Sequence, residues 1–322
     1  MRSALNRRRF LKASAQGAAA ASLAGVSAYF RLPEIIAEET AQGDNPSAWI
    51  TSLIRDYTAN SPANSLKNEA GEKAWDEPLV GFCRGDDPIY QLYKDRVGPF
   101  HWTPLEIFRL TYPDISVRED ELTVISWILP HREAIKADLR KETKNPSEKW
   151  VRARIYGEEF NEELRRHAAA TLTKAGHYAV APTLSSSFKT EKSERYIMAS
   201  SWSERHAAYA AGLGTFGLCD GLITAKGKAM RCGSIVARIR IPATLRPYED
   251  HHAYCLFYAK GICGLCTTRC PAGAVTKSGH DKLACMKQCA ATAQYAAKQF
   301  GLKGYGCGFC QTGVPCESGI PL

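Results

Sequence analysis

The sequence contains no internal repeat and, beyond residues 1–28, no low-complexity segment. It also lacks a strong transmembrane signal, because residues 13–28 carry no charge but are few and only mildly apolar. Outside the N-terminal segment there is no run of basic side chains of the kind that nucleic-acid-binding proteins present along one face. These absences favour a folded protein with no nucleic-acid partner.

Cysteine is scarce over the first 250 residues and abundant in the last seventy, which hold nine of the chain's twelve. The early ones, Cys83, Cys219 and Cys232, are predicted to be small buried apolar side chains. The late ones are Cys255, Cys263-Gly-Leu-Cys266-Thr-Thr-Arg-Cys270-Pro271, Cys285, Cys289, Cys307-Gly-Phe-Cys310 and Cys316. A C-x2-C-x3-C-P run followed by a distant C-x2-C pair is typical of a ferredoxin-like domain that holds two [4Fe–4S] clusters.

The spacing also predicts how the thiolates divide, because the cysteine before proline ligates the other cluster in two-cluster ferredoxins. One set joins this cysteine to the second pair: Cys270, Cys285, Cys307 and Cys310, with Cys289 as the alternative to Cys285. The other set is Cys255, Cys263, Cys266 and Cys316. Cys255 is the nearest candidate for its position, at the unusual spacing C-x7-C. Without Cys255 this cluster would be [3Fe–4S] or would keep an open iron.

Two other uses of cysteine fit the pattern less well. Disulfides are common in exported proteins but do not explain two C-x2-C pairs and a Cys-Pro step. Structural zinc would use four cysteines and leave the others without a role. Iron–sulfur clusters account for the whole set. Three nearby glycines, Gly304, Gly306 and Gly308, are expected to let backbone N–H groups approach the cluster sulfurs.

The N-terminus is typical of a twin-arginine export signal. Arg7-Arg8-Arg9-Phe10-Leu11-Lys12 precedes the uncharged stretch at 13–28, and Val26-Ser27-Ala28 is a candidate cleavage site. Retention of the uncut segment as a membrane anchor is the alternative. Because this route exports folded proteins, clusters are loaded before export. We therefore expect the twin-arginine machinery as a partner, and the periplasm or the outer face of the cytoplasmic membrane as the working compartment.

The positive charge of the chain does not point to nucleic acid. The formal net charge is +9, and residues 1–40 contribute six basic and three acidic side chains, which leaves +6 for the rest. Two oxidised clusters with their thiolates carry about −2 each and offset much of this balance.

Apolar periodicity predicts an α/β core. We expect strands at 123–129, 177–181, 222–224 and 232–241, and helices at 48–57, 147–175 and 203–211, with Ser203 as a helix cap. Four regions follow: a signal and linker (1–40), an irregular and helical N-terminal region (41–120), the α/β core (121–250) and a two-cluster domain (251–322). The aromatic, proline-containing segment 76–120 is expected to be irregular.

One segment carries a family resemblance. Ser203-Glu-Arg-His-Ala-Ala-Tyr-Ala-Ala-Gly212-Leu-Gly214-Thr-Phe-Gly217, with Leu222-Ile-Thr-Ala-Lys-Gly227 and the cysteine region behind it, resembles the superfamily of reductive dehalogenases and epoxyqueuosine reductases. The resemblance covers roughly residues 120–316. It implies a nitroreductase-like α/β core that binds a corrinoid (cobalamin), followed by a ferredoxin-like domain that supplies electrons. It places these residues near the corrin: Arg205, His206, Gly212, Leu213, Gly214 and Gly217.

The implied activity is reduction of an electrophilic small molecule, such as an organohalide, with electrons from a donor protein or a membrane redox component. Candidate proton donors are His206, Tyr209, Tyr196 and Tyr178, although His206 also fits a hydrogen-bonded role in the core. No catalytic residue is assigned. The alternatives are an electron-transfer protein with no corrinoid or substrate of its own, and a protein that reduces or delivers cobalamin. A glycine-rich stretch can also be merely the turn that ends a helix.

The sequence departs from the superfamily in two respects. Epoxyqueuosine reductases have an aspartate proton donor about six residues before the Glu-Arg pair, but the segment around Met198 contains no acid. Export also argues against a cytoplasmic tRNA substrate. Respiratory reductive dehalogenases are exported but considerably longer. The sequence therefore indicates a divergent, shorter member whose substrate it does not name.

Overall fold

The computed structural model describes residues 45–193 and 196–321, which belong to one compact unit. The predicted export signal at 7–12, the stretch at 13–28 and the cleavage site lie outside the described residues.

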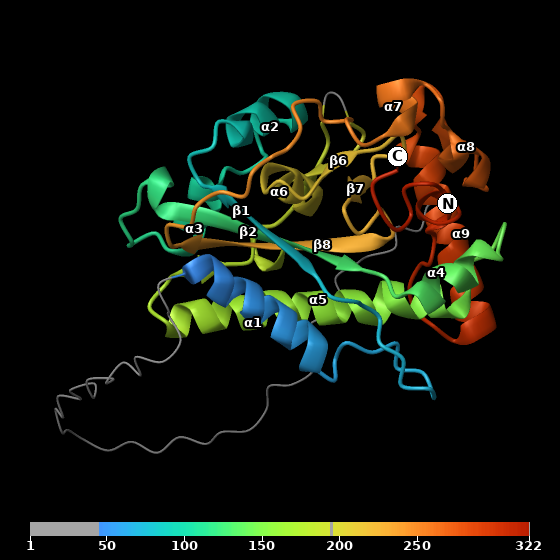
Figure 1. Ribbon diagram of the computed structural model, residues 1–322, viewed down its shortest axis with the longest axis horizontal. Coiled ribbons are helices and arrows are strands. Elements are labelled where there is room, and N and C mark those ends of the chain that lie inside the picture. The colour runs from blue at the N-terminus through green and yellow to red at the C-terminus, as the bar shows by residue number, and fades with distance from the viewer. Residues whose placement is uncertain (1–44, 194–195, 322) are drawn as a thin grey trace, which may run out of the picture. The chain divides into compact units, whose positions relative to one another are not determined.

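A four-stranded antiparallel sheet forms the centre of the molecule (Figure 1). Its strands, in spatial order, are β1 (Leu79–Arg84), β2 (Leu122–Pro130), β8 (Met230–Arg238) and β3 (Ala179–Val180). β2 is buried along its whole length, as expected for an apolar run with packing on both faces. Side chains alternate between the faces, so Ile125 and Trp127 pack on one side and Val124 on the other.

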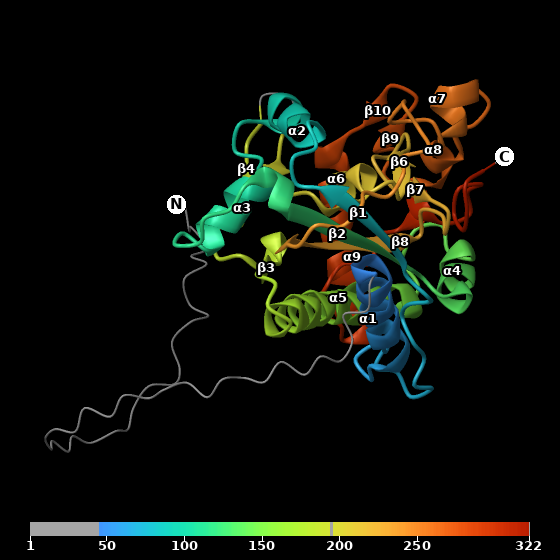
Figure 2. The same ribbon diagram turned by 60° about the vertical axis from the view of Figure 1, so that its left-hand side comes forward.

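Helices cover both faces of the sheet (Figures 1 and 2). On one face lie α1 (Pro46–Asn60) and the long α5 (Glu148–Lys174). On the other face lie α2 (Ile89–Val97), α3 (Pro104–Thr111) and α6 (Glu204–Ala210). α5 has Phe160, Leu164, Ala168 and Leu172 at spacing four, and all four are completely buried. The predicted amphipathic helix is thereby confirmed.

Shorter elements complete the core. They are η1 (Glu119–Glu121), α4 (Glu133–Arg140), η2 (Pro182–Leu184), β4 (Thr190–Glu191), β5 (Ala199–Ser200), β6 (Gly214–Phe216) and β7 (Leu222–Thr224). β4 pairs with β5, and β6 pairs with β7, as separate two-stranded sheets. The predicted cap is confirmed, because the Ser203 hydroxyl accepts from the His206 backbone N–H.

Several expected boundaries change. The strand expected at 177–181 is only two residues long, and the strand expected at 232–241 lies at 230–238. The expectation that 76–120 is irregular is wrong: it contains β1, α2 and α3. β1 includes Gly81 and forms an edge of the sheet, where pairing with β2 stabilises a strand of weak propensity. The sheet thus continues across the boundary expected at residue 120.

The cysteine region gathers at one end of the sheet, drawn in orange and red in Figure 1. Its elements are α7 (Leu256–Lys260), α8 (Leu265–Arg269), β9 (Val275–Thr276), β10 (Gly279–His280), α9 (Lys282–Phe300) and η3 (Phe309–Gln311). α9 is nineteen residues long, which the sequence pattern did not predict. The ferredoxin-like character of this region stays a prediction. Within the described part of the chain, no helix combines the length and apolar character needed to cross a bilayer.

Candidate functional site

A small cavity in the C-terminal region is lined by four thiols: Cys255, Cys263, Cys266 and Cys316. These are the four cysteines predicted to hold one cluster. The other lining residues include Leu218, Ile223 and Val314, together with Lys228. Cys255 caps the start of α7 and Cys266 lies within α8, so two short helices and the C-terminal segment present thiols to one space. Apolar side chains beside a cluster limit the access of water and strengthen electrostatic interactions there.

The second predicted set also comes together. Cys285 and Cys289 lie one turn apart on α9, so their side chains share a face of the helix. The thiol of Cys307 meets that of Cys289, which lowers the pKa of Cys307. Cys285 meets Cys289 and His280, and its pKa rises to about 12 mainly through the contact with Cys289. Cys289 thus lies directly against Cys307, and the assignment of Cys285 as the fourth ligand stays a prediction.

Cys270 and Cys310 connect the two sets. Both pack into the same apolar cluster as Cys255, Cys266 and Cys316. Cys270 lies close enough to Cys307 for the two thiols to interact electrostatically, and the same holds for Cys307 and Cys310. Cys310 lies in η3, just after the loop that carries Cys307. The nine thiols of the predicted clusters therefore occupy one continuous region.

Three glycines hold the loop that carries Cys307 close to α5. A β-carbon on Gly304 would lie 2.5 Å from Ile155, and one on Gly306 would lie 2.4 Å from Val151. On Gly308 it would lie 2.1 Å from Trp150. The structure explains these glycines by close contact with α5, and the expectation that their N–H groups approach the cluster sulfurs stays a prediction.

Among residues 45–193 and 196–321, no three Cys, His, Asp or Glu side chains converge as the ligands of a single metal ion do. The thiolates of a four-iron cluster bind different iron atoms and therefore do not share a single centre.

The structure adds two residues to this site that sequence analysis did not assign. Cys219, expected to be a buried apolar side chain, lies between Cys266 and Cys310 and contacts both thiols. The Lys228 ammonium lies 3.3 Å from the Cys219 sulfur. Cys219 sits in the loop between β6 and β7, thirty-six residues before Cys255. No local spacing could reveal its position, because the fold of the hairpin places it there.

The shifts in the pKa of Cys219 and of Lys228 reflect these contacts. Thiol contacts with Cys266 and Cys310 lower the pKa of Cys219 well below its ordinary value, and Lys228 adds to the effect. Burial acts to lower the pKa of Lys228, but the four surrounding thiols raise it overall. The lysine is therefore a cation among sulfur atoms.

The residues implied to bind a corrinoid lie next to this site but pack against their own chain. The segment 212–217 leads directly to Leu218 and Cys219. Arg205, on α6, donates to the backbone oxygen of Asp220 in the β6–β7 loop. His206 has its Nδ1 2.8 Å from the Ser203 hydroxyl, and burial lowers the pKa of its imidazole to about 3. Its ring packs against Tyr93 and Phe216.

At two glycines of this segment, the space that a side chain would take is already occupied by the backbone of the same protein. A β-carbon on Gly214 would lie 2.2 Å from the Ile223 carbonyl oxygen, and one on Gly212 would lie 2.6 Å from the Leu245 carbonyl oxygen. Leu213 packs beside α6 in the core. The assignment of these residues to a corrinoid stays a prediction.

Replacing Gly214 by alanine is expected to destabilise the protein without any added cobalamin. The new methyl group meets the β7 backbone, and such overpacking costs about 1–3 kcal/mol. Thermal unfolding in the absence of cobalamin measures the effect, with Gly319→Ala as a control for glycine replacement because the nearest atom to a β-carbon there is a carbonyl oxygen 4.0 Å away. An unchanged unfolding temperature together with lost cobalamin binding would instead assign Gly214 to the cofactor.

The candidate proton donors are spread apart. Tyr209 packs between Phe216 and Tyr248 near the β6–β7 hairpin. The ring of Tyr196 lies under the Lys282 ammonium at the start of α9. Tyr178 bonds through its backbone to Arg238, at the end of β8 away from the cysteines. The structure therefore brings Tyr209 and Tyr196, but not Tyr178, to the cysteine side.

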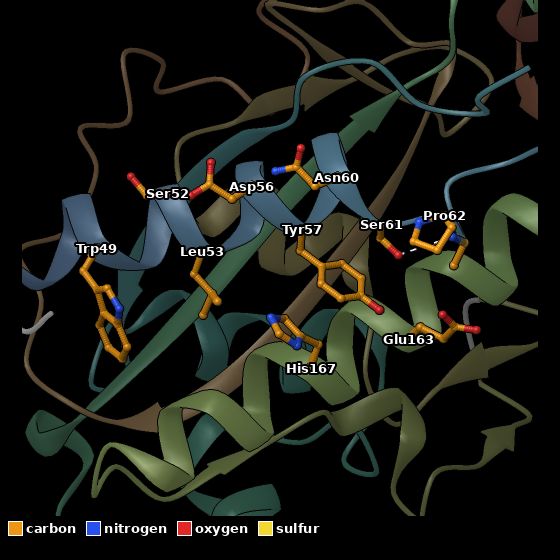
Figure 3. Close-up of a pocket in the computed structure, with 11 residues that line it drawn as sticks. Trp49, Ser52, Leu53, Asp56, Tyr57, Asn60, Ser61, Pro62, Glu163 and His167 are labelled. Atoms are coloured by element: carbon orange, nitrogen blue, oxygen red, sulfur yellow. Dashed lines mark hydrogen bonds between the residues drawn. The ribbon is translucent and has the colours of Figure 1, made fainter. Parts of the chain in front are cut away.

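A larger groove, of about 780 Å³, lies between α1 and α5 (Figure 3). Tyr57 and His167 stack in it with ring centroids 4.2 Å apart. It contains no thiol and lies on the sheet face opposite α6, so it is separate from the cysteine site.

Comparison with known proteins gives structural similarity without a sequence match. No family model matches the chain, and no curated protein matches it. The chain is similar in structure to epoxyqueuosine reductase and to reductive dehalogenases. The same two kinds of reductase belong to the superfamily that the sequence motifs resemble, and the sequence identities are low.

An epoxyqueuosine reductase from Bacillus subtilis shares 18% identity, with 77% of this chain and 63% of that chain covered and a TM-score of 0.41. A reductive dehalogenase whose structure suggests a mechanism for B12-dependent dehalogenation shares 14% identity, covering 76% and 30%, with a TM-score of 0.45. A catabolic reductive dehalogenase in complex with 3-bromo-4-hydroxybenzoic acid shares 12%, covering 85% and 37%, with a TM-score of 0.46. This chain therefore spans less than two thirds of the length of each of these three proteins.

Proposed function

We propose that this chain is an exported iron–sulfur redox protein that holds two [4Fe–4S] clusters and transfers electrons through them. One cluster is held by the cavity set: Cys255, Cys263, Cys266 and Cys316. The other is held by Cys270, Cys307, Cys310 and either Cys285 or Cys289. The single observation that carries the proposal is a cavity lined by four thiols beside a buried lysine.

The donor chemistry fits this group. Thiolates are the ligands of iron–sulfur clusters, and they bind in deprotonated form. A buried cation next to them favours that form. The apolar wall of the cavity supplies the solvent exclusion that tunes the potential of a cluster.

One cluster lies close to the molecular surface, where a partner can reach it. Ile262 and Leu265, which flank Cys263 in sequence, are 70% and 48% exposed. Tyr258, on the preceding helix α7, is also exposed. Such a surface suits an electron donor, either a protein or a membrane redox component. The twin-arginine signal predicts that this exchange takes place in the periplasm or at the outer face of the cytoplasmic membrane.

With a bound corrinoid, the proposed function would extend from electron transfer to the reduction of a substrate. A cofactor at the segment 203–217 would neighbour the cysteine site, because that segment continues into Leu218 and Cys219. A bound corrinoid would supply the reducing metal for an electrophilic substrate such as an organohalide. Backbone carbonyl oxygens occupy the positions where β-carbons of Gly212 and Gly214 would lie, and we assign no catalytic step to the corrinoid.

The iron and cobalt content of the purified protein distinguishes an electron-transfer protein from a corrinoid-dependent reductase. We expect about eight iron atoms per chain in protein purified without oxygen from cells supplied with cobalamin. One cobalt per chain would support the reductase and justify a screen of organohalides. Iron without cobalt, and no uptake of added cobalamin, would leave an electron-transfer protein. Absence of iron, or zinc in its place, would contradict the proposed function.

A further inference from the structure

Lys228 is a charged side chain in the interior of the cysteine site. It is only 3% exposed and lines the same cavity as Cys255, Cys263, Cys266 and Cys316. Its ammonium donates to the Cys219 sulfur at 3.3 Å and also contacts the Cys316 thiol. Its backbone N–H donates to the Cys316 carbonyl oxygen at 2.8 Å. The lysine is thus held on the cluster site at both its backbone and its side chain.

No carboxylate in the described residues lies within ion-pair distance of Lys228. The nearby Glu317 is engaged elsewhere, with Arg140 and with the Gly313 backbone N–H. A lysine buried without an anion is strongly unfavourable, so the fold requires negative charge from the sulfur atoms around it. Thiolates that hold a cluster supply such charge permanently, whereas free thiols are mostly protonated at neutral pH.

Cys219 extends the influence of Lys228 to both clusters. It contacts Cys266 of the cavity set and Cys310 of the other set. It is not among the residues that line the cavity, where four cysteines already provide a full set of ligands. Cys219 therefore lies against one ligand of each cluster, and its sulfur accepts from the Lys228 ammonium.

We propose that Lys228 and Cys219 form a charge-compensating pair that is not ligated to iron and favours the reduced state of the clusters. This inference rests on the proposed function. An oxidised cluster with its thiolates carries about −2, and uptake of one electron from an external reductant adds one further negative charge. A nearby buried cation stabilises the more negative state more strongly. Lys228 thus raises the reduction potential, with most effect on the cluster in the cavity.

The test is a redox titration of Lys228→Met, followed by electron paramagnetic resonance with dithionite as the reductant. Methionine keeps an unbranched stem but removes the charge. We expect unchanged iron content and a reduction equilibrium constant lowered at least tenfold for one cluster, which corresponds to about 59 mV for a one-electron couple. Lys226→Met is the matched control, because Lys226 is exposed two residues away. It should leave both potentials unchanged.

Cys219→Ala tests the second half of the pair. We expect full iron content, because each cluster keeps its own ligands, and a smaller shift than in Lys228→Met, because the cation remains. Loss of four iron atoms in Cys219→Ala would make Cys219 a ligand and would overturn the assigned role.

The inference can fail while the proposed function stands. Wild-type protein with both clusters, and unchanged potentials in Lys228→Met, would overturn the inference alone; wild-type protein without iron would overturn the proposed function. If Lys228→Met does not load clusters, Lys228→Arg decides, because arginine keeps the charge. Loading in the arginine variant supports charge compensation. Failure of both variants would show that shape, and not charge, matters at this position.

Discussion

Replacing Cys307 by alanine is expected to remove one cluster and about half of the roughly eight iron atoms per chain. Cys307 lies in the loop packed on α5 and meets Cys289 of α9, at the centre of the second cysteine set. Alanine has no atom that can bind iron, and a cluster that lacks one thiolate is exposed to loss of iron. Iron analysis and electron paramagnetic resonance measure the change.

Cys232→Ala is the matched control. Cys232 is buried on β8 beside Met230, and burial raises the pKa of its thiol to about 12, so it remains protonated. This variant should keep all its iron. The pair Cys285→Ala and Cys289→Ala then identifies the fourth ligand, since only the true ligand should reproduce the loss seen in Cys307→Ala. Full iron content in Cys307→Ala would contradict the division of ligands.

Replacing Arg165 by methionine is expected to lower the free energy of unfolding by about 3–5 kcal/mol, the typical cost of breaking a buried ion pair. Arg165, on α5, is 3% exposed and bridges Glu158 and Glu204. Without it, the largely buried Glu204 keeps only its hydroxyl partners, Thr183 and Ser234. Denaturant unfolding measures the loss.

The neighbouring Arg166→Met is the control for this prediction. Arg166 pairs with Glu162 on the exposed side of the same helix, where an ion pair contributes about 0–1 kcal/mol. Burial raises the pKa of Glu204 even with Arg165 present. Loss of Arg165 should raise this pKa further, so the deficit of Arg165→Met should shrink as the pH falls and Glu204 becomes protonated. Equal effects of the two substitutions would contradict the buried network.

Much of the fold follows from local pattern. The spacing-four apolar residues of α5 and the continuous apolar run of β2 identify these elements, because periodicity directly reports which side chains are buried. β1 has no comparable signal. It is a short edge strand with a glycine, and it exists because β2 offers it a partner.

The sequence by itself determined which chemistry we propose for this protein. The spacing of the late cysteines is a local property, and a C-x2-C pair such as Cys263 and Cys266 can be read directly from it. Only the tertiary structure decided what surrounds these thiols. Cys219 joins the site through the β6–β7 hairpin and Lys228 through the connection from β7 to β8, and Gly212 and Gly214 accommodate carbonyl oxygens of the chain's own backbone. Such contacts form between segments that are distant in the sequence, and they cannot be deduced from the spacing of residues along the chain.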